Sequence, residues 1–421
     1  MLTTRCCIAG CGPAGAMVGL LLARAGLSVT VLEKHADFLR DFRGDTIHPS
    51  TLEILNDIGL ADRFLRELPH SEVSQLQMRL PNGLGLRQDF RTIPSRFKFI
   101  AFVPQWDFLG FVTREAARYP GFRLLMQSEV TDLLTDHDQV TGVRIRTPNG
   151  DDEIHADLTI GADGRTSRVR EAAGLPLTET SPPMDVLWFR VSRRPTDSES
   201  VELRLQPGHF FALINRQEYW QVAYVIPKGA YARERTHGLD AFRRALATGV
   251  PELADRVDEL QDWDQIKLLS VRADRLRRWY KPGLLCIGDA AHAMSPIAGV
   301  GINIAIQDAV EAANLLWAPL ERGQVTLRQL ARVQRRREVP VRVTQAVQNL
   351  LQENVLRPTL GADAESGNVA LPRLMPFAMR LPLVRDLPAR FIALGLGRPH
   401  VRTPARATPA AQARSVIAAT G

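Results

Sequence analysis

The stretch CCIAGCGPAGAMVGLLLARAGLSVTVLE, residues 6–33, joins a short apolar run, a glycine-rich turn, a helical pattern and a second apolar run. Within it GCGPAG, Gly10–Gly15, fits the pattern G-x-G-x-x-G, and Glu33 ends the second run. In this pattern the first glycine permits a tight turn, the second lets the backbone approach a pyrophosphate, and the third lets helix and strand pack closely. The helix N-terminus then faces the phosphates and the acid accepts hydrogen bonds from a ribose. The stretch predicts a strand–helix–strand unit that binds a dinucleotide, either NAD or FAD.

The composition of the chain limits the kind of protein to which this unit belongs. The chain has 421 residues, of which 45% are hydrophobic and 24% charged, as in an ordinary globular protein of two domains or one domain with large insertions. The net charge is +7, and only five of the 53 basic residues are lysines. The arginines are scattered and no nucleic-acid-binding motif accompanies them, so we expect no nucleic-acid partner.

Cysteine usage and hydropathy favour a cytoplasmic protein. The four cysteines have neither metal-ligand nor disulfide spacing, and we expect buried, reduced thiols. The first residues do not form a signal peptide, and no run of 18 uncharged apolar residues predicts a membrane span. The nine histidines form no metal-ligand pattern, so we expect no metal.

The pattern along the chain predicts two interleaved domains of an α/β fold. Residues 1–74, 99–178 and 273–350 form the domain that contains the glycine turn, with a helix after Pro49 that Ser50 and Thr51 can cap. Alternating residues in 75–98 and 179–272 predict a β-rich second domain. Residues 351–400 read as a helical segment, and residues 401–421 as a disordered tail.

Two further motifs follow strand-like runs. GADGRTSRVR, residues 161–170, places Asp163 and Gly164 directly after an apolar run. GDAAHAMSPIAGVGIN, residues 288–303, places Asp289 at the end of another and then a loop of small residues before a helix. Each motif alone is compatible with an ordinary strand–helix turn. A loop without large side chains indicates that the backbone itself approaches a ligand.

The order of motifs, GCGPAG, FRGDTIHPSTL (residues 42–52), GADGRTSRVR and GDAAHAMSPIAGVGIN, resembles that of the group A flavoprotein monooxygenases, the para-hydroxybenzoate hydroxylase-like family. The resemblance covers about residues 1–350. It implies a Rossmann-like FAD-binding domain of the glutathione reductase type, an interleaved β-sheet substrate domain and C-terminal helices. It also implies FAD as cofactor and NADPH or NADH as co-substrate.

By this resemblance Glu33 and the glycine turn hold the ADP half of FAD, Asp163 lies near the pyrophosphate and Asp289 near the ribityl chain. The loop before the last helix would lie against the isoalloxazine, with the backbone N–H groups of Ile302 and Asn303 at its pyrimidine edge. The full set of cofactor-binding residues expected is Gly10, Gly12, Pro13, Ala14, Gly15, Glu33, Lys34, Arg43, Gln105, Val130, Asp163, Gly288, Asp289, Pro296, Gly299, Gly301, Ile302 and Asn303.

In the family NAD(P)H reduces the flavin, O₂ forms a C4a-hydroperoxide, and this hydroxylates an aromatic or polycyclic substrate. The candidate catalytic residue is His48, since a histidine with a pKa near neutrality can assist phenol deprotonation. A purely structural role at the following helix is an equal alternative. His292 reads as structural, bonding the loop backbone.

The pocket should lie between the inserted sheet and the flavin, with Phe211, Arg216 and Tyr224 as candidates, although strand register is not fixed by sequence. None of the six tryptophans makes the W-x-W-x-I-P pattern of the flavin-dependent halogenases. A flavin-dependent reductase similar to the prenyl-lipid reductases and a non-catalytic flavin-binding regulator remain alternatives. The oligomeric state, monomer or homodimer, stays open.

Overall fold

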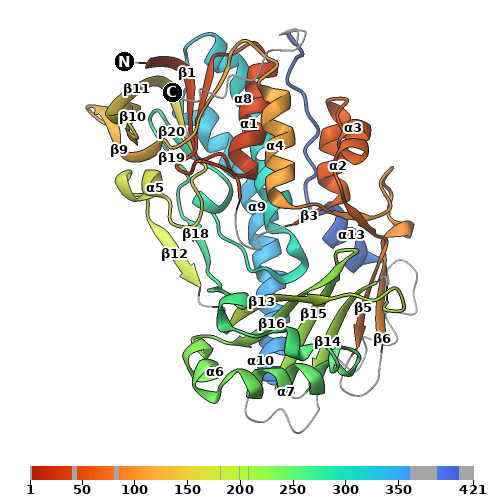
Figure 1. The fold of residues 1–421 in the computed structure, drawn as a ribbon. Helices are drawn as coiled ribbons and strands as arrows, with labels where there is room; N and C mark the ends of the chain where they lie inside the picture. Colours follow the sequence, from red (N-terminus) through yellow and green to blue (C-terminus); the bar gives the residue numbers. More distant parts are fainter. Residues whose placement is uncertain are drawn as a thin grey trace.

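The computed structural model describes residues 2–39, 45–79, 85–180, 182–198, 200–206, 208–360 and 386–406. It contains two large sheets, one above the other in Figure 1, with a long helix running between them. The glycine turn belongs to the upper sheet. The predicted α/β fold is confirmed.

The upper sheet has eight strands, and its core order is β19-β20-β11-β1-β2-β8, with β10 and β9 added beyond β11. Strands β20, β11, β1, β2 and β8 pair in parallel, as expected for strand–helix–strand units. Their bounds are β1 Leu2–Ala9, β2 Val29–Leu32, β8 Phe122–Leu125, β9 Glu129–Asp136, β10 Gln139–Thr147, β11 Gly150–Gly161, β19 Tyr280–Lys281 and β20 Leu284–Cys286.

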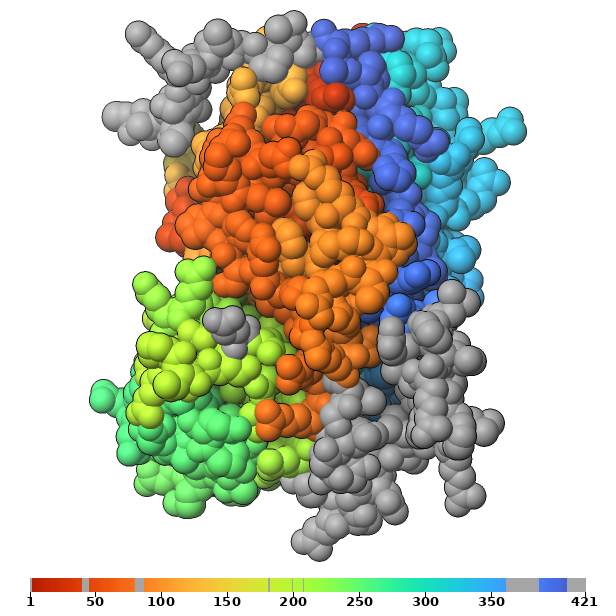
Figure 2. All heavy atoms as spheres, turned by 90° about the vertical axis from the view of Figure 1, so that its right-hand side faces the viewer, coloured from red at the N-terminus to blue at the C-terminus, as the bar shows by residue number. Residues whose placement is uncertain are grey.

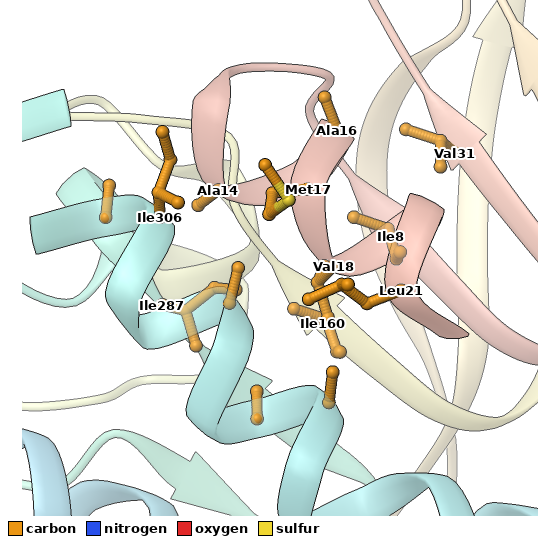
Figure 3. Close-up of a cluster of buried hydrophobic side chains, with 14 of the residues drawn as sticks. Ile8, Ala14, Ala16, Met17, Val18, Leu21, Val31, Ile160, Ile287 and Ile306 are labelled. Carbon is orange, nitrogen blue, oxygen red and sulfur yellow. The ribbon is translucent and has the colours of Figure 1, made fainter. Parts of the chain in front are cut away.

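Helix α1, Pro13–Arg24, is apolar all round because it is enclosed on both sides. It packs on the parallel strands between α8 and α4, and Figure 3 shows the contacts of Met17 and Val18 of α1 with Ile8 and Ile160 of the sheet and with Ile306 of α8. The remaining helices of this half are α2 Pro49–Asp57, α3 Ala61–Glu67, α4 Gln105–Ala116, α5 Arg168–Ala172 and α8 Gly301–Glu321.

The lower sheet has seven strands in the order β17-β13-β16-β15-β14-β5-β6, antiparallel except where β14 pairs with β5. Its bounds are β5 Gln75–Arg79, β6 Gly85–Asp89, β13 Met184–Ser192, β14 Val201–Gln206, β15 His209–Asn215, β16 Tyr219–Pro227 and β17 Lys267–Leu269. Helices α6, Tyr231–His237, and α7, Leu239–Gly249, cover one face of this sheet. The other face is turned toward the upper half.

Small elements connect the two halves. A three-stranded sheet is made by β3 Thr46–Ile47, β7 Ile100–Phe102 and β4 Ser71–Val73, and a two-stranded one by β12 Leu177–Thr180 and β18 Ala273–Leu276. Helix α9, Leu327–Leu351, passes Pro340 without ending and continues through a π-helical turn into α10, Arg357–Leu360.

The C-terminal part of the chain returns along the upper half of the molecule. Helix α13, Leu387–Leu394, lies beside α2, and residues 395–406, which we call the strap, run back along the upper half. In Figure 2 the strap lies between the orange N-terminal residues and the light-blue helices. Residues 401–406 of the expected tail are held by hydrogen bonds, including Arg406 N to Arg24 O (3.1 Å), and residues 407–421 lie outside the described residues.

One detail of helix capping was predicted wrongly. His48, not Ser50 or Thr51, is the N-cap of α2, and Pro49 takes the first helical position. A proline there loses no hydrogen bond and its fixed φ suits the helix, so α2 begins two residues earlier than capping by Ser50 would place it.

Candidate FAD and substrate site

A single cavity of about 970 Å³ extends from the glycine turn to the upper face of the lower sheet. Its upper part is lined by residues of the turn, the ends of β2 and β11 and the loop before α8. Its lower part is lined by the lower sheet, α9 and α13. The size and the continuity allow a long ligand in the upper part to meet a second ligand in the lower part.

The glycine turn has the shape that a phosphate site needs. A Cβ on Gly10 would lie 2.5 Å from Ala162 O, and one on Gly15 would lie 1.9 Å from Gly10 O, so both positions are closed to side chains. A Cβ on Gly12 would meet nothing within 4 Å, and Gly12, Pro13 and Ala14 line the cavity at the start of α1. The backbone therefore leaves open space at a helix N-terminus, where an anion is favoured.

Glu33 lies at the end of β2 on the same side of the cavity. Its carboxylate accepts hydrogen bonds from Cys11 N (3.3 Å) and His35 N (3.1 Å), which fixes the acid against the glycine turn. Lys34, Ser128 and Val130 line the cavity beside it. Glu33 and the glycine turn, both expected at the ADP half of FAD, thus lie together.

Asp163 holds the turn that follows β11. Its carboxylate accepts from Ser167 Oγ (2.5 Å) and from Val169 N (3.1 Å), at the start of α5, and burial raises its pKa. Asp163 also lines the cavity, as does Arg165, which the sequence reasoning missed. Arg165 Nε lies 3.9 Å from Asp289 Oδ2. The arginine directly after the Asp-Gly pair was the available signal.

Asp289 lines the cavity from a short 3₁₀ turn, Gly288–Ala290, and a buried ionic cluster supports this turn from behind. Asp308 accepts from Gly288 N (3.1 Å), His292 Nε2 (2.5 Å) and Arg337 Nε (2.8 Å). Burial alone would raise the pKa of Asp308, but its interactions with His292 and Arg337 lower it overall. The sequence predicted that His292 bonds the loop backbone, but its side chain bonds this carboxylate.

The loop of residues 296–303 lines the cavity with Pro296, Gly299, Gly301 and Ile302. Gly299 has φ +62°, and a Cβ there would lie 2.5 Å from Thr46 Oγ1, so only glycine fits. Helix α8 begins at the end of this loop, so its first amide groups, which have no partner within the helix, start at the cavity wall.

Asn303 has a role that the sequence did not reveal, because its buried side chain connects three segments. Its Oδ1 accepts from His48 N (2.9 Å) and Thr51 Oγ1 (2.8 Å), and its Nδ2 donates to Thr46 O (3.0 Å) and Gly299 O (3.3 Å). The expectation concerned only its backbone amide. The side chain instead ties the loop to β3 and α2.

His48 lines the cavity and is almost fully buried. Its Nδ1 lies 2.7 Å from Ile392 O in α13, and since a carbonyl only accepts, Nδ1 carries the proton. Burial lowers the pKa of His48 to about 4. The imidazole is therefore neutral near pH 7 and connects α2 with the C-terminal wall of the cavity.

Two of the three residues predicted to line the pocket lie on the opposite face of the lower sheet. Phe211 and Tyr224 stack on each other, with ring centroids 4.5 Å apart, in the core beneath α7. The cavity is faced instead by their neighbours, among them Phe210, Ala212 and Ala223. Arg216, the third candidate, does line the cavity. The prediction failed because alternation along a strand does not say which face is covered.

Arg43 and Gln105 were also expected to bind the cofactor. Arg43 lies outside the described residues. Gln105 lines the cavity at the first position of α4.

Within the described ranges, no group of three or more His, Cys, Asp or Glu residues could hold a metal ion, and no helix is long and apolar enough to cross a membrane.

Comparison with known proteins agrees with this geometry. The family model described as an FAD binding domain matches residues 3–347. The chain belongs to this family and, within it, to the group A flavoprotein monooxygenases. The predicted family and enzyme class are thereby confirmed.

The individual relatives and solved structures are between 19% and 30% identical to this chain. The chain is 30% identical over 394 residues to the 6-methylpretetramide 4-monooxygenase of Streptomyces rimosus, an alignment that covers 93% of this chain and 92% of that protein. The OxyS anhydrotetracycline hydroxylase of Streptomyces rimosus is 23% identical, with a TM-score of 0.71 over 93% of this chain and 76% of that one. The p-nitrophenol 4-monooxygenase PnpA of Pseudomonas putida DLL-E4 is 19% identical, with a TM-score of 0.73 over 94% and 100%. The two structures share the fold.

Proposed function

We propose that this protein hydroxylates a polycyclic aromatic substrate with NADPH or NADH and O₂, using bound FAD. The balanced reaction consumes one NAD(P)H, one proton and one O₂ and yields hydroxylated substrate, NAD(P)⁺ and water. The observation that carries the proposal is the single cavity in which the dinucleotide-binding turn and an apolar sheet face meet. The similarity to a pretetramide monooxygenase supports a polycyclic substrate.

We propose that FAD lies in the upper part of the cavity. The open space at Gly12 suits the pyrophosphate, Glu33 suits the ribose, and Asp289 suits the ribityl hydroxyls. The side-chain-poor loop of residues 296–303 leaves room for a flat ring system. When bound, FAD supplies the transfer of electrons from NAD(P)H to O₂ and of one oxygen atom to the substrate.

The chain's own residues would then bind and orient the cofactor and the substrate and shield them from water. The N-terminus of α8 favours negative charge at the cavity wall, and it is fixed there before reaction, so no reorganisation is needed. The apolar lower sheet excludes water around the reacting ring. We infer that His48, neutral and bonded to Ile392 O, positions α13 in preference to acting as a base.

The test is turnover by the purified flavoprotein with a panel of one- to four-ring phenols. We expect one or more polycyclic phenols to accelerate anaerobic flavin reduction by NADH or NADPH, and to gain one labelled oxygen from ¹⁸O₂. If no ligand accelerates reduction and no labelled product forms, the hydroxylase proposal fails. A ligand that gains two hydrogens without oxygen would identify a reductase instead.

The cofactor assignment is tested separately by Asp289→Ala. We expect the variant to lose most of its bound FAD, because the carboxylate that would bond the ribityl hydroxyls is removed. Asp138→Ala, at an exposed turn aspartate, is the matched control and should retain FAD. Stoichiometric flavin in Asp289→Ala would contradict the assignment.

A further inference from the structure

The part of the cavity that the lower sheet lines is nearly free of charge. Its surface is made by side chains such as Met184, Val186, Trp188, Phe210 and Val225. Helix α9 and the turn after it add the apolar Leu351 and Leu356 and the neutral Gln348. A ligand seated here exchanges water mainly for apolar contacts, which favours a large uncharged ring system.

Arg216 is the exception. Among the described residues, it is the one charged side chain that the lower sheet and its turns contribute to the cavity lining. It follows β15 in the turn to β16, and its guanidinium lies over the ring of Phe102, 5.3 Å from the centroid. An arginine in such a place is well suited to bind a carboxylate through two parallel hydrogen bonds.

That capacity is already taken by Asp45, which also lines the cavity and lies 171 positions away in the sequence. Arg216 Nη2 bonds Asp45 Oδ2, and Arg216 Nε donates to Gln221 Oε1 (2.8 Å). The side chains of Arg216 and Asp45 are 8% and 12% exposed. The guanidinium is thus neutralised and oriented from within the protein.

Stability does not explain this pair. Burial raises the pKa of Asp45 and lowers the pKa of Arg216, so for both groups the cost of burying the charge exceeds the gain from their mutual attraction. Buried ion pairs in general add little to folding stability compared with apolar residues, whereas removing one partner leaves an uncompensated charge. Because Asp45 and Arg216 both line the cavity, their charges act on any ligand that enters it.

We propose that the Asp45–Arg216 pair is a specificity element that keeps the substrate part of the cavity neutral, and so selects uncharged polycyclic phenols against carboxylated ones. The inference rests on the proposed function, because it assumes that this part of the cavity receives the substrate. A carboxylate entering the cavity loses its hydration and gains no free counter-ion, because Arg216 is already paired with Asp45. An uncharged ring does not bear this cost.

The test compares binding of 3-hydroxy-2-naphthoate and its methyl ester to the oxidised holoenzyme, followed through the flavin absorbance. The wild-type protein should prefer the ester by about tenfold or more, since a carboxylate buried without a counter-ion loses its hydration uncompensated. Asp45→Asn releases the charge of Arg216 and should move the preference toward the acid by about tenfold. Asp157→Asn breaks the exposed pair with Arg5 and should leave the preference unchanged.

Equal binding of acid and ester by the wild-type protein would overturn the proposal, and so would a folded Asp45→Asn whose preference is unchanged. If Asp45→Asn fails to fold, Asp45→Ser, which also leaves the charge of Arg216 unpaired, should give the same shift toward the acid, and an unchanged preference there would overturn the proposal. Binding requires no turnover. Ester preference without hydroxylation would therefore refute the proposed function alone, and hydroxylation without ester preference would refute the specificity element alone.

Discussion

At the scale of single residues, His48 shows how burial sets the chemistry of a side chain. Its folded pKa of about 4 lies below the ordinary value of 6.5 because burial disfavours the charged imidazolium. Between these two values the unfolded chain binds the proton more readily than the folded one. The contribution of neutral His48 to stability is therefore complete above about pH 6.5 and is lost as the pH falls toward 4.

This linkage can be measured with His48→Asn, whose amide can still donate to Ile392 O but does not titrate. Between pH 7 and pH 4 the wild-type free energy of unfolding should fall by up to about 3 kcal/mol more than that of the variant. Thermal unfolding of both proteins across this range gives the comparison. Parallel curves would mean that His48 is not a buried neutral group in the folded protein.

At the scale of elements, the turn between β1 and α1 separates two uses of glycine. Gly15 permits close packing within the protein, whereas Gly12 leaves space that the protein itself does not fill. Both uses appear as the same letter in the sequence. Only the surrounding backbone distinguishes them.

We expect Gly15→Ala to lower the stability of the apoprotein by about 1 to 3 kcal/mol, because its Cβ would collide with Gly10 O. Gly12→Ala should change apoprotein stability by less than about 0.5 kcal/mol, since no atom lies within reach of the new Cβ. Both variants should lose FAD affinity. The measurements are thermal unfolding of the apoproteins and fluorescence titration with FAD. A Gly12→Ala protein that binds FAD normally would remove the pyrophosphate from this position.

Element by element, the sequence predicted what depends on neighbours in the chain. The glycine turn, the strands around it and the loop of residues 296–303 follow from short-range patterns, because tight turns and side-chain-free approaches restrict residue type locally. The covered face of the lower sheet did not follow, since it depends on where α7 packs and Phe211 suits either face. The pairing of Asp45 with Arg216 joins distant segments, and no local pattern announces it.

At the scale of the whole molecule, the strap fastens the C-terminal wall of the cavity to the upper half. Asp57, at the end of α2, accepts from Val401 N (2.9 Å), and His400 Nδ1 lies 3.1 Å from the same carboxylate oxygen. Arg24 Nη1 donates to Thr403 O (3.1 Å). The contacts of Asp57 are exposed and that of Arg24 is only partly buried, so the strap should be among the first parts to open.

Asp57→Ala should therefore raise the amide exchange rate of residues 395–406 by about tenfold, since hydrogen bonds to a charged group are lost. Exchange in the buried strands β1 and β11 should not change. Hydrogen exchange read by mass spectrometry measures both, and Asp62→Ala, which removes an exposed pair with Arg96, is the control. A uniform increase over all strands would indicate general destabilisation instead of local opening.

The strap also implies an order of assembly. The bond from Arg24 to Thr403 spans 379 positions and that from His48 to Ile392 spans 344, whereas the glycine turn and its strand–helix–strand unit need only neighbouring residues. Long-range contacts form late because a large loop must close first. On a ribosome, the upper part of the cavity can thus take shape while its lower part still lacks a wall. Nascent chains stalled before residue 386 should already be able to capture FAD, and the ability to enclose a substrate should arrive only when α13 and the strap emerge.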